Sequence, residues 1–81
     1  MAALLAVASP GTAQSTLLES VKRNPQEAKA LCRQFRALNA KGTSALSSQA
    51  IGQLARQRNL STTDAEILAT YVIGLHCPDV R

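Results

Sequence analysis

The residues with the richest chemistry in this 81-residue chain are its two cysteines, Cys32 and Cys77, and its one histidine, His76. A redox motif or a zinc-ligand pair places cysteines close together, as in Cys-x-x-Cys, whereas these two lie far apart in the chain. The adjacent pair of His76 and Cys77 supplies too few ligands for a metal site. We therefore expect no metal and no cofactor, and we interpret Cys32 and Cys77 as a structural disulfide rather than a redox switch.

Catalytic groups are equally sparse. Because His76 is the only histidine, no Ser-His-Asp or Cys-His-Asp set can be assembled elsewhere in the chain. A cationic His76 at a helix end complements the helix dipole. The four carboxylates before the tail all fall in expected first helical turns, where capping accounts for them: Glu19, Glu27, Asp64 and Glu66. Only Asp79 lies in the tail. We therefore do not expect an enzyme.

A basic stripe is the strongest candidate binding surface. Lys29, Arg33 and Arg36 have the i, i+4, i+7 spacing of one helix face. The formal net charge of +4 permits an anionic partner, either a lipid surface, an acidic protein or a polyanion, and the alternative is an ordinary solvated face. Phe35 and Tyr71 are the only aromatic residues, and no nucleic-acid motif is present, so a specific nucleic-acid reader is not expected.

Residues 1–13 have the pattern of a secretory signal, which would leave a single mature domain over residues 14–81. An apolar, uncharged stretch from Met1 to Ala8 precedes a break at Pro10, and Gly11-Thr12-Ala13 supplies the small residues of a cleavage site. No Lys or Arg precedes the apolar stretch, so we expect the signal to be truncated at its N-terminus. The alternative is a short apolar helix that packs on the domain. Neither this stretch nor any later one reaches the ~20 apolar residues that span a bilayer.

The remainder of the chain predicts an all-α fold, a small bundle of about four helices. Glycine and proline are sparse, at four and three residues, which favours helices over a turn-rich β fold. Apolar spacing and capping residues give the bounds: from Thr16 to about Arg23, from Asn24 to Gly42, from Ser47 or Ser48 to about Arg58 with Asn59 as terminator, and from Ser61 or Thr63 to about Leu75.

The last of these segments is apolar on almost every side, so we expect it to be buried or covered and to form the centre of the bundle. Cys32 falls on the apolar face of the second helix and Cys77 directly after the central helix, so packing of the two would let the cysteines bridge. A loop of this length contributes about 4 kcal/mol in the chain-entropy model. A domain this small is marginally stable alone and needs such a staple, which forms in oxidising compartments.

Three segments carry a resemblance: Ala30-Leu31-Cys32, the aliphatic run from Ala65 to Leu75, and His76-Cys77-Pro78. They resemble small exported helical families of unknown function, and most of all the mycobacterial-type exported domain in which a signal peptide precedes a helical domain with one cysteine pair. The tail is also similar to bacterial hypothetical proteins that end in Tyr-Val-x-Gly-Leu-x-Cys-Pro-Asp-Val. The resemblance covers about Leu17 to Asp79. It implies a fold and a compartment and carries no catalytic residues.

The leading hypothesis is an exported, non-enzymatic interaction or accessory module with an unidentified protein partner, in the periplasm, a thylakoid-like lumen or the extracellular space. It would use the basic stripe or a surface of the fourth helix. The alternative is a small acid-activated periplasmic stress chaperone, which shares the size, helicity and long-loop disulfide. The chain has only five acidic residues, so carboxylate protonation would be a weak trigger.

Overall fold

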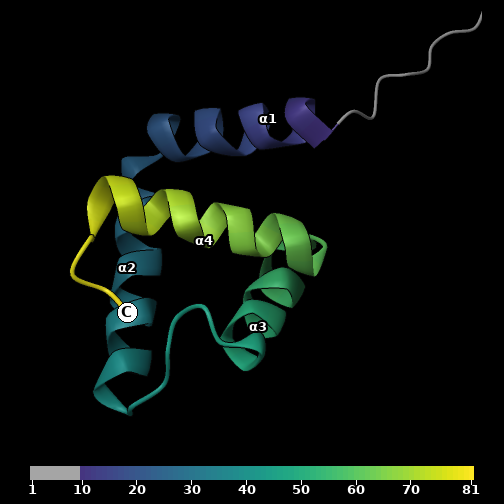
Figure 1. Ribbon diagram of the computed structural model, residues 1–81. Helices are drawn as coiled ribbons and strands as arrows, with labels where there is room; N and C mark the ends of the chain where they lie inside the picture. The colour runs from purple at the N-terminus through teal and green to yellow at the C-terminus, as the bar shows by residue number, and fades with distance from the viewer. Residues whose placement is uncertain (1–9) are drawn as a thin grey trace, which may run out of the picture.

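The computed structural model describes residues 10–81 (Figure 1). Four helices follow one another: α1 (Pro10–Arg23), α2 (Pro25–Ala40), α3 (Ser48–Arg58) and α4 (Thr62–His76), with no strand in this part of the chain. The prediction of a small all-α bundle of about four helices is confirmed. Residues 1–9 of the expected signal lie outside the described residues.

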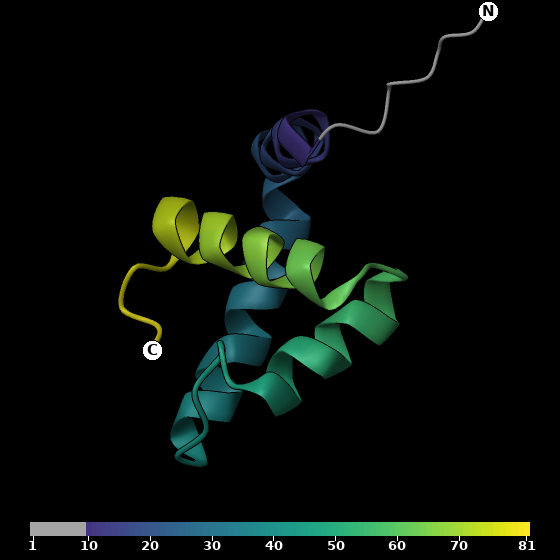
Figure 2. The ribbon, with the colours of Figure 1, turned by 45° about the vertical axis from the view of Figure 1, so that its right-hand side comes forward.

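Helix α4 is the central element, as predicted. It contacts each of the other three helices. Helix α1 crosses α4 obliquely, with both helices beginning on the same side of the molecule. Helix α2 passes behind α4 at a steep angle, and α3 leads up to its first turn (Figures 1 and 2). The residues that α4 buries share one helix face: Ala65, Leu68, Ala69 and Val72. This inner face of α4 organises the core.

Every segment of the described chain contributes to that core. Val21 comes from α1, and Ala45 comes from the loop between α2 and α3. Cys77 and Val80 bring in the tail that follows α4, although that tail has no helical or strand structure. The most deeply buried large side chains are Leu31, Val72 and Cys77. The half-cystine therefore packs as a core residue as well as forming a link.

The start of α1 differs from the prediction. The helix begins at Pro10, not at Thr16, because proline fits the first helical turn, where its missing N–H would have no intrahelical partner. Thr16 therefore lies within the helix, and the capping box predicted with Glu19 is wrong. Glu19 instead forms an i, i+4 ion pair with Arg23 at 3.5 Å. Cleavage before Gln14 stays a prediction.

Three helix ends match the sequence pattern. The Ser47 hydroxyl accepts a hydrogen bond from the Ala50 amide at 3.1 Å, and Ser61 accepts one from Asp64 at 3.1 Å. Asn59 ends α3 in the left-handed conformation, with φ of 56°. Ser47 and Ser61 are therefore the caps, of the two candidates given for each helix.

Two expectations about polar side chains fail. The Asn24 amide does not cap α2 but donates to the Ser20 carbonyl at 3.2 Å, so it completes the end of α1 instead. Glu66 lies beyond the first turn of α4, where Asp64 is the only acidic residue. Ser61 and not Thr63 caps the helix, so Glu66 lies five residues after the cap instead of three. At this position its side chain is exposed. Capping therefore does not account for Glu66.

Candidate functional site

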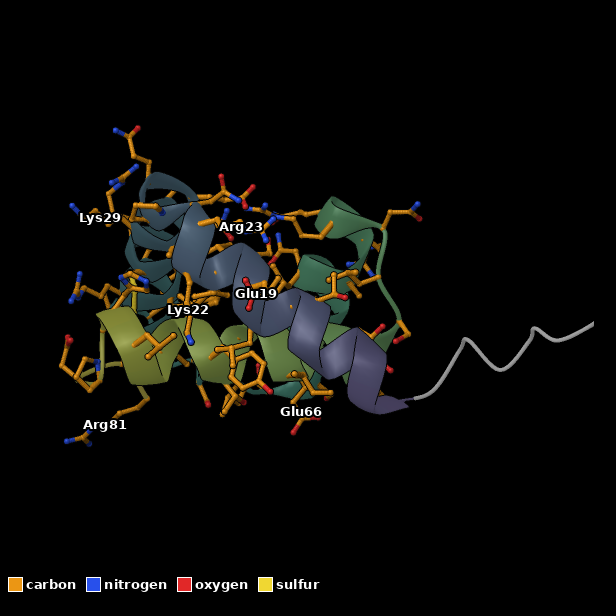
Figure 3. All side chains as sticks on the ribbon, turned by 90° about the horizontal axis from the view of Figure 1, so that it is seen from above. Glu19, Lys22, Arg23, Lys29, Glu66 and Arg81 are labelled. Carbon is orange, nitrogen blue, oxygen red and sulfur yellow. A yellow bond between two sulfur atoms is a disulfide. The ribbon has the colours of Figure 1, made fainter. Side chains whose placement is uncertain are left out.

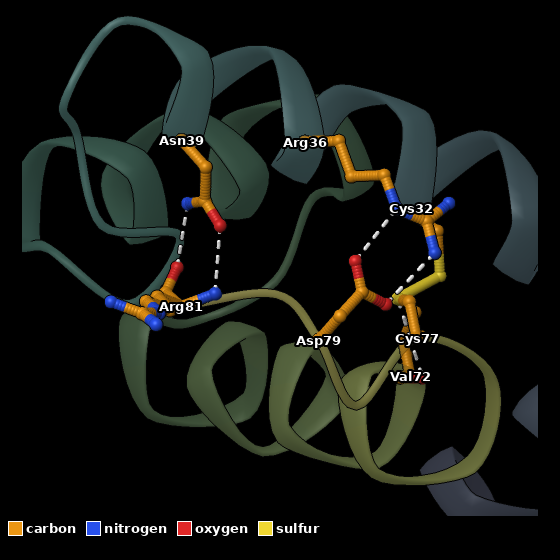
Figure 4. Close-up of polar contacts among 7 residues, drawn as sticks. All are labelled: Cys32, Arg36, Asn39, Val72, Cys77, Asp79 and Arg81. Carbon is orange, nitrogen blue, oxygen red and sulfur yellow. Dashed lines mark hydrogen bonds and ion pairs between the residues drawn. A yellow bond between two sulfur atoms is a disulfide. The ribbon is translucent and has the colours of Figure 1, made fainter.

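The clearest constellation joins α2 to the tail. The Cys32 and Cys77 sulfurs form a disulfide of 2.06 Å with a Cα–Cα distance of 6.1 Å (Figure 4). Both residues are buried. The pairing predicted from the sequence is the one that the structure makes, and it fixes the residue after α4 to the buried face of α2.

A second link lies one turn along α2. The Arg36 guanidinium donates from Nε to one Asp79 oxygen at 3.1 Å and from Nη2 to the other at 2.9 Å (Figure 4). The hydrogen bond from Arg36 is the main cause that lowers the pKa of the Asp79 carboxyl. The same bond raises the pKa of Arg36. Arg36 was predicted to face an external anion, but it holds an anion of its own chain.

A third link follows Arg36. The Asn39 side-chain amide donates to the Arg81 carbonyl at 2.7 Å and accepts from the Arg81 amide at 2.7 Å, as a neighbouring backbone would. It also donates to the Thr43 carbonyl at 3.0 Å. The Arg81 carbonyl accepts a further bond from the Ala45 amide at 2.7 Å. The tail is thereby tied to α2 and to the loop that follows it.

We call these three links the tail clamp: Cys32 with Cys77, Arg36 with Asp79, and Asn39 with Arg81. Its α2 members have i, i+4, i+7 spacing. Its tail members flank a turn in which the Val80 amide donates to the Cys77 carbonyl at 3.0 Å. Sequence reasoning found the cysteines but missed Asn39 and Asp79. The signal that could have found them is the helical spacing of Arg36 and Asn39 from Cys32, together with a tail that the disulfide holds beside them.

The basic face, defined as Lys29, Arg33 and Arg36, is thus divided. All three side chains are exposed, and Arg36 is paired with Asp79. Among the described residues neither Lys29 nor Arg33 forms an ion pair. Figure 3 shows Lys29 and Arg81 along the same edge of the molecule. The face retains two uncompensated cations beside a neutralised pair.

One other cation is also held within the protein. Arg58, in the last turn of α3, forms an ion pair and a hydrogen bond with Glu27 in the first turn of α2. Glu27 therefore has a structural role as well as complementing the helix dipole. This ion pair links α2 directly to α3, whereas the main packing contacts of both helices are with α4.

His76 occupies the last turn of α4 and is half-buried. Over residues 10–81 it forms no hydrogen bond or ion pair with a carboxylate or hydroxyl group. No group of three or more His, Cys, Asp or Glu side chains in that range is placed to hold a metal ion. No helix in that range is long and apolar enough to cross a membrane.

Two open hollows flank these elements. One of about 460 Å³ lies between the tail and the end of α2 and is lined by Asn39, Gly42, Thr43, Ser44, Asp79 and Arg81. Its amide and carboxylate already serve the tail clamp. The other, of about 310 Å³, lies on the outer side of α4 and is lined by Thr63, Glu66, Ile67, Thr70 and Tyr71. Of these two hollows, only the second is lined by large apolar side chains, those of Ile67 and Tyr71.

The outer side of α4 carries a row of apolar residues at i, i+4, i+8, which we call the outer stripe: Ile67, Tyr71 and Leu75. Ile67 and Tyr71 are half-buried, and Tyr71 packs against the core. Leu75 is 51% exposed. The expectation that α4 is buried or covered on every side therefore holds for its inner face but not for Leu75 within the described structure.

Comparison with known proteins identifies a family. The family described as "Domain of unknown function (DUF8664)" matches residues 18–77, which span α2, α3, α4 and both cysteines. No curated protein and no solved structure matches the chain. The expected membership of a family of unknown function is confirmed, and the mycobacterial type stays a prediction. The chain belongs to the DUF8664 family.

Proposed function

We propose that this protein is an exported, non-enzymatic interaction module whose basic face binds an acidic surface on a protein partner. The observation that carries the proposal is that Lys29 and Arg33 are exposed and, among the described residues, without ion pairs. Six of the nine basic residues make no ion pair in that range, and these two are adjacent on one helix face. Complementary charge speeds encounter and selects among partners.

The tail clamp supports this role by holding the helix that presents the cations. Cys32 lies between Lys29 and Arg33 in sequence, and its link to Cys77 fixes α2 relative to α4. A surface that is rigid before binding loses less conformational entropy in the complex. The buried disulfide also supports export, because such bonds persist in the periplasm, in oxidising lumens and outside the cell.

A capture experiment with matched charge reversals tests the proposal. The oxidised protein is used as bait in an envelope or secreted fraction, beside the variants Lys29→Glu/Arg33→Glu and Lys41→Glu/Arg56→Glu. Lys41 and Arg56 are also exposed and form no ion pair in the described range, so the second variant changes net charge equally away from the basic face.

We expect the wild type and the control variant to recover the same acidic protein, and the basic-face variant to lose it. Raising salt from about 0.15 M to about 0.5 M should weaken the capture, because added salt screens exposed charges. Equal recovery by both variants would rule out the basic face. Equal recovery at both salt concentrations would rule out an electrostatic contact.

A second candidate, a small acid-activated chaperone, is supported by the Arg36–Asp79 link. The link depends on an ionised Asp79, so acid removes one of the three ties on the tail. Released tail residues would uncover the apolar site of Val80, which is 7% exposed. A client-aggregation assay at low and neutral pH tests this candidate. We expect suppression at low pH that Asp79→Asn shows already at neutral pH, and equal aggregation with and without the protein rejects it.

A further inference from the structure

We propose that a hollow between α2 and α3 binds an extended peptide segment of a partner protein, and that this segment carries an acidic side chain. The hollow has a volume of about 340 Å³, and its polar lining consists of three glutamines and one lysine: Gln34, Gln53, Gln57 and Lys41. None of these residues belongs to the basic face, so the inference does not depend on the function proposed above. It rests on the hydrogen-bonding capacity of the amides, on their spacing and on charge.

Two helices position the polar side chains of this hollow. Gln34 and Lys41 are seven residues apart on α2, or two turns, so both lie on one side of that helix. Gln53 and Gln57 are four residues apart on α3, so they also share a side. After the loop that joins them, α3 runs back beside α2, and the ion pair described above holds its last turn to the first turn of α2 (Figure 1). The hollow lies between these two sides.

The three glutamine amides have hydrogen-bonding capacity that the protein does not use. Gln34, Gln53 and Gln57 are exposed, and within residues 10–81 their side chains form no hydrogen bond to another residue. A side-chain amide has one accepting oxygen and a donating NH₂ group, and a peptide backbone offers the complementary groups. Asn39 shows this pairing within the protein, because its amide donates to the Arg81 carbonyl and accepts from the Arg81 amide, both at 2.7 Å.

The spacing of the amides on α3 fits an extended chain. Four residues separate Gln53 from Gln57, which is a rise of about 6 Å along the helix axis. In an extended chain, residues two apart lie about 6.6 Å from each other and present their N–H and C=O groups on the same edge. One extended segment can therefore pair with both amides at once. A helical segment cannot, because its backbone groups are already bonded within the helix.

Two apolar residues complete the lining of the hollow. Ala37 is exposed, and Leu38 is half-buried and packs against the core. Successive side chains of an extended segment point to opposite faces, so one of them can contact this apolar surface while its neighbours face solvent. The volume is near the lower end of the range of about 300–1,000 Å³ that is usual for ligand sites. The hollow therefore suits a few residues of a segment and not a whole domain.

Charge selects an acidic segment as the occupant. Lys41 is the only charged residue in the lining of this hollow, and its exposed side chain forms no ion pair within the described range. On the same side of α2, Glu27 lies about 21 Å away along the helix axis and is neutralised by Arg58. A carboxylate of the segment is therefore attracted to Lys41 and meets no acidic residue of the lining. The combination of free amides with one cation indicates an extended segment that contains Asp or Glu.

An NMR titration of the oxidised, ¹⁵N-labelled full chain tests the proposal directly. The probe is the peptide Thr-Val-Thr-Val-Asp-Ser, acetylated and amidated at its ends so that the Asp side chain carries its only charge; its β-branched residues favour an extended chain. We expect saturable shifts of the side-chain amide signals of Gln34, Gln53 and Gln57, with a dissociation constant of about 1 mM, because a contact this small leaves little affinity after the cost of ordering. No shift of these signals at about 10 mM peptide overturns the proposal.

Matched variants of the protein separate the hollow from the net charge. Gln57→Ala should weaken binding about fivefold through lost hydrogen bonds, while alanine preserves the helix. Gln26→Ala, an exposed change outside the lining, should bind as the wild type does. Lys41→Gln should weaken binding about threefold, and Lys29→Gln, which removes the same charge from the basic face, should not. Equal weakening by the two lysine variants overturns the site. Contacts this weak are not retained in a capture experiment, so they do not affect the charge-reversal control described above.

Changes in the peptide test the backbone contact itself. Replacing its Asp by Asn should weaken binding about threefold, and an unchanged dissociation constant overturns the acidic preference. Methylating the backbone nitrogens of alternate residues removes the N–H donors from one edge of an extended segment. We expect one alternating set of methyl groups to abolish binding and the other set to leave it nearly unchanged, because only one edge faces the glutamine amides. Equal effects of the two sets overturn the extended arrangement.

Discussion

The tail clamp and the outer stripe differ in how firmly the described chain holds them. Along the tail, Cys32, Arg36 and Asn39 each hold a specific partner, one covalent, one ionic and one hydrogen-bonded. Along the outer stripe, Leu75 is half exposed and has no such partner within the described chain. A domain of this size cannot bury all of its apolar surface. Within the described chain, the specific side-chain ties therefore lie along the tail and not along this row of α4.

The clamp joins two segments of different local structure. Its α2 members lie about one helical turn apart on one face. The tail forms a turn in which the Val80 amide donates to the Cys77 carbonyl at 3.0 Å, and its clamp members are every second residue from Cys77 to Arg81. The three links therefore depend on the position of this turn beside α2.

Removing the disulfide should have the largest effect on this contrast. We expect Cys32→Ala/Cys77→Ala to lower the free energy of unfolding by about 4 kcal/mol. Without the disulfide, the unfolded chain is no longer closed into a loop over a sequence separation of 45, so its conformational entropy is higher. That loss is comparable with the whole stability of a small domain. Urea unfolding followed by circular dichroism measures it.

The control is the same unfolding curve with and without a dithiol reductant. Reductant should destabilise the wild type by a similar amount and leave the double-alanine variant unchanged. An unaffected wild type, with thiols shown to be free by alkylation, contradicts the assignment of the clamp as the main source of stability.

Shortening side chains on the two sides of α4 should separate its roles. Val72 is 1% exposed, and Val72→Ala should lower the free energy of unfolding by about 2 kcal/mol through lost burial and a residual cavity. Leu75→Ala, measured in dilute protein, should change it by less than about 0.5 kcal/mol, as is usual for exposed sites. Comparable losses at both positions would show that the outer side of α4 is packed within the monomer.

Most of the fold was predictable because the signals were local. Ser47, Ser61 and Asn59 identify helix ends through bonds within one turn, and the apolar rows of α2 and α4 identify the core faces. The start of α1 was missed because a proline was read only as a breaker, although it also suits the first turn of a helix. Thr16 is of a residue type that often caps helices, but it lies inside α1 and not at its N-terminus.

The site was predictable only in part, because its remaining members come from opposite ends of the chain. The Cys32–Cys77 pairing followed from there being two cysteines in the whole sequence. Arg36 has many possible partners by sequence, and its pairing with Asp79 depends on how α2 crosses α4. Asn39 is an ordinary helix residue until the tail lies beside it. Long-range polar contacts of this kind are set by packing, which local patterns do not encode.

The Asn39 amide should contribute less than the disulfide but more than a surface residue. Asn39→Ala removes three hydrogen bonds, two of them to Arg81, and should lower the free energy of unfolding by about 1–2 kcal/mol. Hydrogen exchange at the Ala45 and Arg81 amides should become faster. Gln34→Ala, an exposed change elsewhere on α2, is the control and should alter neither measurement. Unchanged exchange in the Asn39 variant contradicts its role in the clamp.

The Arg36–Asp79 pair should have the smallest effect, because both groups are exposed. The pKa of Asp79 is lower in the folded protein, so the pair adds stability above the unfolded aspartate pKa of about 3.9 and loses it as the pH falls through the folded value. Asp79→Asn removes this contribution at every pH. The difference in thermal midpoint between wild type and variant should therefore be largest at neutral pH and should vanish as the pH falls below the folded pKa of Asp79.

The same comparison in the Cys32→Ala/Cys77→Ala background sharpens the contrast between the links. With the covalent tie gone, the tail depends on Arg36 and Asn39, so exchange at the Val80 amide should respond more strongly to acid. If Asp79→Asn changes Val80 exchange equally in both backgrounds, the links act independently. A larger change without the disulfide shows that the disulfide alone is enough to hold the tail in the wild type. The polar links then hold the tail only when the disulfide is absent, and the tail is released only when both kinds of link are lost.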